Sequence, residues 1–160
     1  EESFQITYTQ AGFYTAVWGI GVVLGGITGG RLTDRVGFQR AVKGALLASL
    51  AAILALAFIF SPQMAWPLAA IFGLAYGYYE TVYFALSMRL TDPRIAASMF
   101  SILMAVANLG TAIGVGLSGF LVDSIGYRGT FAIIAGLNLL ALPLLPVIFG
   151  RSAQRTAQAK

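Results

Sequence analysis

The chain has 160 residues, of which 58% are hydrophobic and only 10% are charged, with a formal net charge of +4. A soluble core of this length could not hide so much apolar surface, so the composition excludes a soluble globular protein and predicts an all-α membrane protein. The chain contains no cysteine and no histidine, which excludes thiol and Ser-His-Asp catalysis and most zinc sites. We therefore expect no enzyme activity, no metal and no cofactor.

Five apolar segments follow one another along the chain, each close to the ~20 residues that cross ~30 Å of hydrocarbon. They leave no room for a soluble domain, so we predict a single transmembrane domain over residues 1–160. We expect the chain to be part of a longer protein, because it does not begin with Met and five spans leave its ends on opposite sides of the membrane. The predicted spans are residues 12–29, 41–60, 66–87, 96–121 and 129–149, and a polar cytoplasmic tail follows at 150–160.

The basic residues predict how the chain is oriented. With five spans, nine of the ten lysines and arginines fall on one side of the membrane, and Arg128 alone falls on the other. The positive-inside rule makes the first side cytoplasmic. The positive net charge therefore reports topology rather than nucleic-acid binding, and we expect a multi-pass protein of the plasma membrane, of the kind found in the bacterial inner membrane.

Small residues recur at spacing four in two of the predicted spans. This pattern lets two helix backbones approach closely, and we interpret both rows as helix-packing faces rather than ligand sites. The first row is Gly21, Gly25 and Gly29, and the second is Gly110, Gly114 and Ser118. Between them, Asp92 and Pro93 predict the start of the fourth helix, since Asp caps helices and Pro fits their first turn.

One pattern, Gly-x-Leu-x-Asp-x-x-Gly-aromatic, occurs twice, from Gly30 to Phe38 and from Gly119 to Tyr127. Three predicted spans lie between the two copies. Because three is an odd number of crossings, the two copies lie on opposite sides of the membrane. This arrangement indicates an inverted-topology repeat, which is typical of secondary transporters. The alternative is a coincidence of Gly/Asp turns in a glycine-rich chain.

The first copy, through Arg40, resembles the signature loop of the major facilitator superfamily, and the second resembles the outer hairpin between the fifth and sixth helices of a half. The resemblance covers nearly the whole chain and implies helices two to six of a six-helix half. Phe38 and Gln39 replace basic residues of the signature, which favours the C-terminal half. The stretch 88–94 is also similar to the branch with muropeptide permeases and acetyl-CoA transporters.

In this family the signature loop is associated with conformational switching. Asp34 at a helix end, near arginines, could hold neighbouring helix ends by charge-assisted bonds that break when the cytoplasmic side opens. The alternative is that the arginines only set topology. The resemblance assigns a gating loop of Gly30, Asp34, Arg35, Gly37 and Arg40, and an outer hairpin of Gly119, Asp123, Gly126 and Arg128.

Glu80 is the only ionisable residue well inside a predicted span. A charged group in hydrocarbon costs at least ~2.5–3.5 kcal/mol, so Glu80 should face the bundle interior or a wet cavity. Burial favours the protonated carboxyl, which would let Glu80 take up and release a proton during transport. The alternatives are a structural hydrogen bond to a neighbouring helix or a position nearer the interface.

Aromatic and polar side chains near Glu80 predict a substrate cavity. Tyrosines on one helix face can hydrogen-bond a polar ligand and stack on its apolar parts, although such stripes also serve helix packing. Asn108 and Thr111 lie mid-span in the fourth helix, where they could contact the ligand or join helices. The predicted cavity residues are Trp18, Tyr76, Tyr79, Tyr83, Asn108 and Thr111.

Together these features predict a secondary active transporter of a small polar or amphipathic solute that works by alternating access and is coupled to protons as a symporter or antiporter. Its expected partners are the solute, protons, the lipid bilayer and the other six-helix half, with no nucleic acid. The alternative is a transport-inactive membrane interaction or regulatory module that packs through its glycine rows. A membrane-embedded enzyme agrees less well with the sequence, because it would need several acids, bases or metal ligands close together. Glu80 is almost alone as an ionisable residue within the predicted spans.

Overall fold

The structure, a computed structural model, describes residues 7–59, 61–89, 91–140 and 143. These ranges contain helices and no strand, which confirms the predicted all-α class. The elements are α1 (Tyr8–Val36), α2 (Phe38–Ala57), α3 (Pro62–Arg89), the 3₁₀ turn η1 (Pro93–Ile95) and α4 (Ala96–Leu140).

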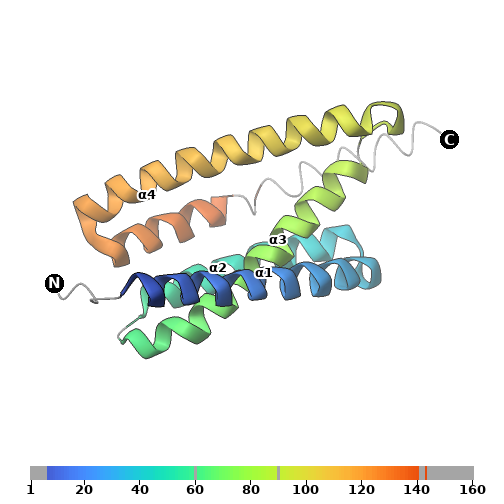
Figure 1. The fold of residues 1–160 in the computed structure, drawn as a ribbon. Coiled ribbons are helices and arrows are strands. Elements are labelled where there is room, and N and C mark those ends of the chain that lie inside the picture. The colour runs from blue at the N-terminus through green and yellow to red at the C-terminus, as the bar shows by residue number, and fades with distance from the viewer. Residues whose placement is uncertain (1–6, 60, 90, 141–142, 144–160) are drawn as a thin grey trace.

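Helix α4 is two helical arms joined at Gly126, whose backbone is not helical, with φ 73° and ψ 172°. The first arm covers residues 96–125 and the second arm covers 127–140, and Figure 1 shows the chain reversing direction between them. The arms lie at the predicted fourth and fifth spans. Residues 141–142 and 144–149 of the fifth span, and the tail at 150–160, lie outside the described residues.

Gly37 separates α1 from α2 in the same way, with φ 79° and ψ 159°. Side chains other than hydrogen are strained in this backbone region, which explains why both turns use glycine. Gly37 and Gly126 occupy the same position in the repeated pattern, and their turns lie at opposite ends of the molecule (Figure 1). The repeat in the sequence is thus also a repeat in backbone conformation.

The predicted loop at residues 30–40 is wrong in length, because α1 continues to Val36 and α2 begins at Phe38. A single glycine suffices for the turn. Its N–H donates to the carbonyl oxygen of Thr33 at 3.0 Å, and its carbonyl oxygen accepts from the N–H of Ala41 at 3.0 Å. Most of the gating residues named above therefore lie on helix ends rather than in a loop.

Helices α1, α2 and α3 all begin earlier than the predicted spans. Helix α1 starts at Tyr8 because Thr7 and Gln10 form a reciprocal cap, in which each side chain accepts a hydrogen bond from the other's backbone N–H. Helix α3 starts at Pro62 and contains Pro67. The predicted helix start at Asp92 is confirmed, since its carboxylate accepts the N–H of Arg94 at 2.9 Å.

Successive helical segments alternate in direction, from α1 through both arms of α4 (Figure 1). By length and apolarity, α1, α2 and the continuous stretch Pro93–Leu140 could cross a membrane, which makes three candidate spans among the described residues. The last of these contains both arms of α4. Helix α3 does not meet the same criteria, so the count of five spans stays a prediction.

The closest packing joins α1 to α3 through glycines. Gly21, Gly25 and Gly29 are buried against α3, as the row of small residues predicted. A methyl group at Gly21 would lie 2.5 Å from the carbonyl oxygen of Ala70, and one at Gly25 would overlap the backbone of Leu74. The two helices can approach this closely only because these side chains are absent.

Helix α3 contributes glycines to the same contact, and the sequence analysis did not identify them. A methyl group at Gly73 would overlap the carbonyl oxygen of Trp18, and one at Gly77 would overlap that of Val22. The spacing of four between Gly73 and Gly77 was the available signal. The two helices run in the same direction, with rising residue numbers on α1 matched by rising numbers on α3.

Tyr78 joins three helices at the centre of the core. It is buried, packs with Ala41, Ala45 and Val82, and lies against Gly29 of α1. Its hydroxyl donates a 2.9 Å hydrogen bond to the carbonyl oxygen of Ala41 on α2. The side chain thus links α3 to α1 through packing and to α2 through both packing and a hydrogen bond.

Replacing Tyr78 with phenylalanine is expected to lower the free energy of unfolding by about 1 kcal/mol, because the ring stays and one buried hydrogen bond is lost. The measurement is thermal unfolding of the detergent-purified protein. Tyr79→Phe is the matched control, since the Tyr79 side chain is 40% exposed and its hydroxyl makes no hydrogen bond within the described ranges. Equal shifts for both variants would contradict a role for the Tyr78 hydroxyl.

Candidate functional site: a polar aromatic face on α3

Glu80 lies in the second half of α3, nine residues before the end of the helix at Arg89, and is partly exposed. Tyr76 is one turn before it and Tyr83 is one turn after it, so all three side chains share one face of the helix. Among the described residues, the Glu80 carboxylate has no hydrogen-bond or ion-pair partner. The structure therefore does not show the structural hydrogen bond that was one alternative for Glu80.

Aromatic rings surround this face. The ring centroids of Trp18 on α1 and Tyr76 on α3 are 5.7 Å apart, and Tyr76 also lies 6.5 Å from Phe72. Tyr79 and Tyr83 are stacked with centroids 6.5 Å apart and planes 9° from parallel. Four of the six predicted cavity residues are thus brought together in two ring pairs along α3.

The Trp18 indole carries an unusual feature. Its Nε1 atom is buried, yet it has no hydrogen-bond acceptor among the described residues. A buried N–H without a partner typically costs ~1–3 kcal/mol, so an acceptor that reached it would gain that much. Trp18 is therefore a candidate hydrogen-bond donor for a ligand that binds at this aromatic face.

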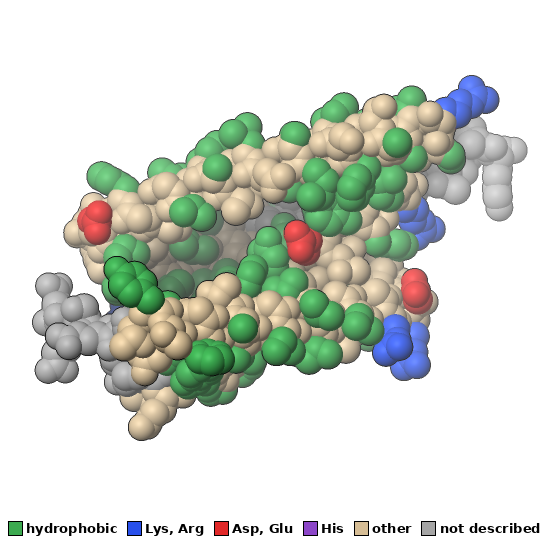
Figure 2. Space-filling model, in the orientation of Figure 1, with side chains coloured by type: hydrophobic (Ala, Val, Ile, Leu, Met, Phe, Trp, Pro, Cys, Tyr) green, Lys and Arg blue, Asp and Glu red, His purple; other side chains and the backbone are tan. Residues whose placement is uncertain are grey.

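The two predicted cavity residues on α4 make no hydrogen bond to this face among the described residues. Asn108 is exposed, and the Thr111 hydroxyl donates to the carbonyl oxygen of Ala107 in its own helix at 3.0 Å. The ring contact from α3 to α4 joins Phe84 and Phe100, with centroids 5.8 Å apart. Away from that contact, Figure 2 shows a hollow between α4 and the layer that contains α1 and α3.

At the turn between α1 and α2, the gating residues Asp34, Arg35 and Arg40 are exposed, and no ion pair joins them within the described part of the chain. Gly30 lies in ordinary contact distance of Thr81 on α3. The predicted charge-assisted latch is therefore not made between these residues, and a partner for Asp34 would have to come from elsewhere.

A different contact at this end was not predicted. The Arg89 guanidinium lies 4.8 Å from the centre of the Phe38 ring, which connects the last turn of α3 to the first turn of α2. Such a cation–π contact contributes about 0.5–1 kcal/mol at exposed sites. The sequence offers no pattern that would pair these two residues, because they are 51 positions apart.

At the opposite end, Gly126 forms the turn between the arms of α4, while Asp123 and Arg128 beside it are exposed. No described residue lies within 4 Å of a methyl group placed at Gly119. On the face shown in Figure 2, the basic side chains gather at the end where α1 meets α2 and where α3 ends. This distribution agrees with the predicted charge asymmetry between the two sides of the membrane.

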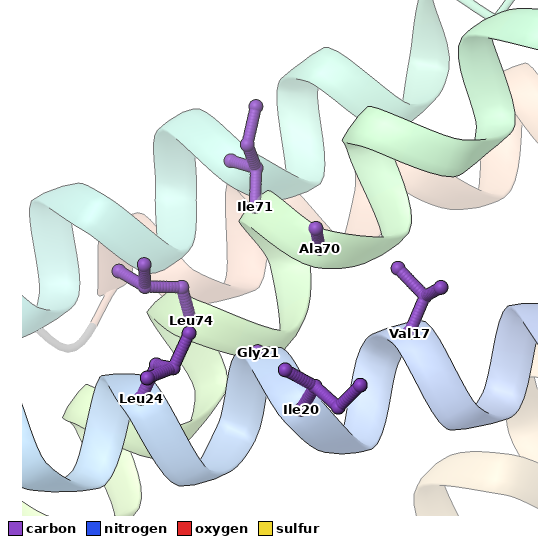
Figure 3. Close-up of a pocket in the computed structure, with 7 residues that line it drawn as sticks. All are labelled: Val17, Ile20, Gly21, Leu24, Ala70, Ile71 and Leu74. Carbon is purple, nitrogen blue, oxygen red and sulfur yellow. The ribbon is translucent and has the colours of Figure 1, made fainter.

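An apolar groove of about 210 Å³ lies between α1 and α3 (Figure 3). It offers no polar side chain, so it does not suit a polar solute. Ile71 in its wall and Glu80 are nine residues apart, which at 100° per residue puts them on opposite faces of α3. The groove and the polar aromatic face are therefore separate. The groove is lined by Val17, Ile20, Gly21, Leu24, Ala70, Ile71 and Leu74.

Comparison with known proteins provides a relative and a family. A stretch of 84 residues is 32% identical to the purine ribonucleoside efflux pump NepI of Escherichia coli O127:H6 (strain E2348/69 / EPEC). The match covers 48% of this chain and 21% of that pump, so the chain spans only a small part of this curated relative. The family match is complete and covers residues 1–160. With its apolar helices, the chain is a multi-pass membrane protein of the plasma membrane, and it belongs to the Major Facilitator Superfamily.

Proposed function

We propose that this chain is five transmembrane helices of a six-helix half, the C-terminal one, of a secondary active transporter that works by alternating access. The observation that carries the proposal is the polar aromatic face of α3, where the Glu80 carboxylate lies between tyrosines and has no hydrogen-bond or ion-pair partner among the described residues. Placing a carboxylate at this depth in a membrane costs free energy, so such a residue is by default a candidate functional site. The family membership and the efflux relative support a transport role and a protein that is not an enzyme.

Proton coupling follows from the chemistry of Glu80. A carboxyl group that faces a cavity can bind a proton from water on the side to which the cavity is open. Each change of access would then let the proton leave on the other side. No other acidic residue lies in the middle of a described helix, since Asp34, Asp92 and Asp123 are near turns.

The ring pairs suggest what the solute looks like. Trp18 and Tyr76 present faces on which a planar ring can stack, and the Trp18 N–H and the Tyr76 hydroxyl can bind its polar atoms. Purine ribonucleosides, which the name of the relative describes as the cargo of that pump, have this combination of a planar base and polar groups. A small polar or amphipathic solute with a flat ring is therefore the substrate class that we propose.

The turn at Gly37 has a place in this mechanism. The solute would bind near the midplane between this half and the other six-helix half, and the half would tilt as a body. Asp34, Arg35 and Arg40 at the turn of Gly37 are exposed and available to helix ends of that other half. Ion pairs formed there would hold one side closed and break when it opens.

The test is transport by the whole protein to which this chain belongs, reconstituted in vesicles with an imposed proton gradient. We expect purine nucleosides to accumulate against their gradient, and a protonophore to abolish the accumulation. Pyrimidine nucleosides and simple sugars provide the comparison for ring size and planarity. Transport that ignores the protonophore would contradict proton coupling. If nothing in the panel is moved or bound, the alternative of a transport-inactive interaction module is favoured.

A further inference from the structure

The apolar groove between α1 and α3 is separate from the polar aromatic face and lies open at the surface (Figure 3). Its volume is about 210 Å³, and Ile20, Leu24 and Ile71 in its walls are 61%, 51% and 52% exposed. In a membrane, an open apolar groove is covered by lipid acyl chains or by another helix, because both are apolar. The charges near the groove distinguish these two occupants.

The α1 wall of the groove continues as an apolar stripe toward the turn between α1 and α2. Ile20, Leu24 and Ile27 recur at spacings of four and three residues, and all three are exposed. The next position of this stripe is Arg31, and Arg35 follows one turn later. Both arginines are exposed. One face of α1 thus leads from the groove to two cations.

Neither arginine is paired within the described ranges of the chain. Asp34 is close to both in sequence and is exposed, but no ion pair or hydrogen bond joins its carboxylate to either guanidinium there. A guanidinium presents five N–H donors in a planar fork that matches the oxygens of a phosphate. Arg31 and Arg35 are therefore available to an anion at the membrane surface.

The opposite end of the α1–α3 pair offers nothing comparable to an anion. No charged residue occurs at positions 8–30 of α1 or at positions 62–79 of α3. The positive-inside rule makes the arginine end cytoplasmic. The cytoplasmic leaflet carries anionic lipids, which basic residues near its surface attract. The charges therefore favour an amphiphile that enters from the cytoplasmic leaflet.

The distance from the arginines to the groove fits one phospholipid. At 1.5 Å per residue, Leu24 lies ~10 Å and Ile20 lies ~16 Å along the helix axis from Arg31. Half of a ~30 Å hydrocarbon core is ~15 Å. An acyl chain whose phosphate lies at the level of Arg31 therefore ends at the level of Ile20 and Gly21. Both residues line the groove, and Leu74 lies in its other wall.

We propose that the groove and the two arginines together bind an anionic phospholipid of the cytoplasmic leaflet, with an acyl chain in the groove and the phosphate on Arg31 and Arg35. A helix that filled the groove would also need an anionic group at the level of Arg31, whereas a phospholipid carries both parts at this spacing. The bound lipid covers the open side of the contact that Gly21 makes with α3, and so stabilises the α1–α3 pair. This inference goes beyond the transport function and does not depend on it.

The first experiment measures thermal unfolding of the whole protein in detergent while phosphatidylglycerol or phosphatidylcholine with the same acyl chains is added. We expect phosphatidylglycerol to raise the midpoint at lower concentration, and Arg31→Gln to weaken its apparent affinity about fivefold. Arg94→Gln is the matched control, because Arg94 is exposed at the same end but lies in η1, off the stripe. Each variant is compared with its own lipid-free midpoint. Equal affinity for the two lipids, or equal weakening by both substitutions, would overturn the proposal.

The second experiment locates the acyl chain. Phosphatidylglycerol with a photoreactive group in its chain is added to the whole protein, and the labelled peptides are identified by mass spectrometry. We expect labels at residues 17–24 and 70–74, removed by excess unlabelled phosphatidylglycerol but not by phosphatidylcholine. Ala70→Leu, which fills the groove, should reduce this labelling. Labels that avoid both stretches would show that another helix covers the groove, and would overturn the proposal.

Discussion

Replacing Gly25 with valine is expected to separate α1 from α3 and to cause a large loss of stability. A methyl group at this position already overlaps the backbone of Leu74, and a backbone cannot move aside as a side chain can. Overpacking of a tight contact typically costs ~1–3 kcal/mol, and the rigid neighbour places this variant at or above ~3 kcal/mol. The measurement is thermal unfolding and monodispersity of the detergent-purified protein.

Gly19→Val is the matched control, because it makes the same change on the same helix. No described residue lies within 4 Å of a methyl group at Gly19, so only the helix propensity changes. That term is small and favours valine over glycine by a few tenths of a kcal/mol. If the two valine variants unfolded at the same temperature, the α1–α3 contact would not determine the stability of the fold.

Replacing Glu80 with glutamine is expected to remove gradient-driven accumulation of solute while leaving exchange of solute across the membrane. Glutamine keeps the size and the hydrogen-bonding capacity of the side chain but cannot release a proton. With one proton per solute, a gradient of one pH unit corresponds to ~1.4 kcal/mol and sustains about tenfold accumulation. The variant should therefore lose this tenfold accumulation in reconstituted vesicles.

Glu80→Asp retains an ionisable group on a shorter side chain and is the control. It should keep accumulation, at a lower rate if the carboxylate must reach the solute or water. Equal accumulation by the parent protein and the glutamine variant would mean that Glu80 does not carry the proton, even if the chain is a transporter. Loss of exchange as well as accumulation would instead indicate that Glu80 binds the solute or supports the fold.

Local features of the chain predicted much of the fold. Apolar segments of suitable length predicted the helices, and the repeated pattern placed the turns at Gly37 and Gly126. The α1 row of Gly21, Gly25 and Gly29 was correctly interpreted as a packing face. The errors were also local. Helix α1 runs on to Val36 because a one-residue turn needs no loop, and it starts at Tyr8 because of a capping box.

The candidate site was predicted only in part. Trp18 and Tyr76 do meet, and Tyr79 does stack on Tyr83. Asn108 and Thr111, placed at the same depth by counting residues, do not join them within the described chain. Depth along a helix follows from the number of residues, but the direction of a face depends on how helices rotate against each other.

The sequence by itself determined that the chain is a membrane protein, which segments are helical, and where the backbone must be glycine. These properties depend on composition and on neighbours within a few residues. Only the tertiary structure decided that α1 and α3 interlock through glycines from both sides, that Tyr78 bonds to Ala41, and that Arg89 covers Phe38. Each of these contacts joins residues far apart in sequence, and it forms only when two particular helix faces meet.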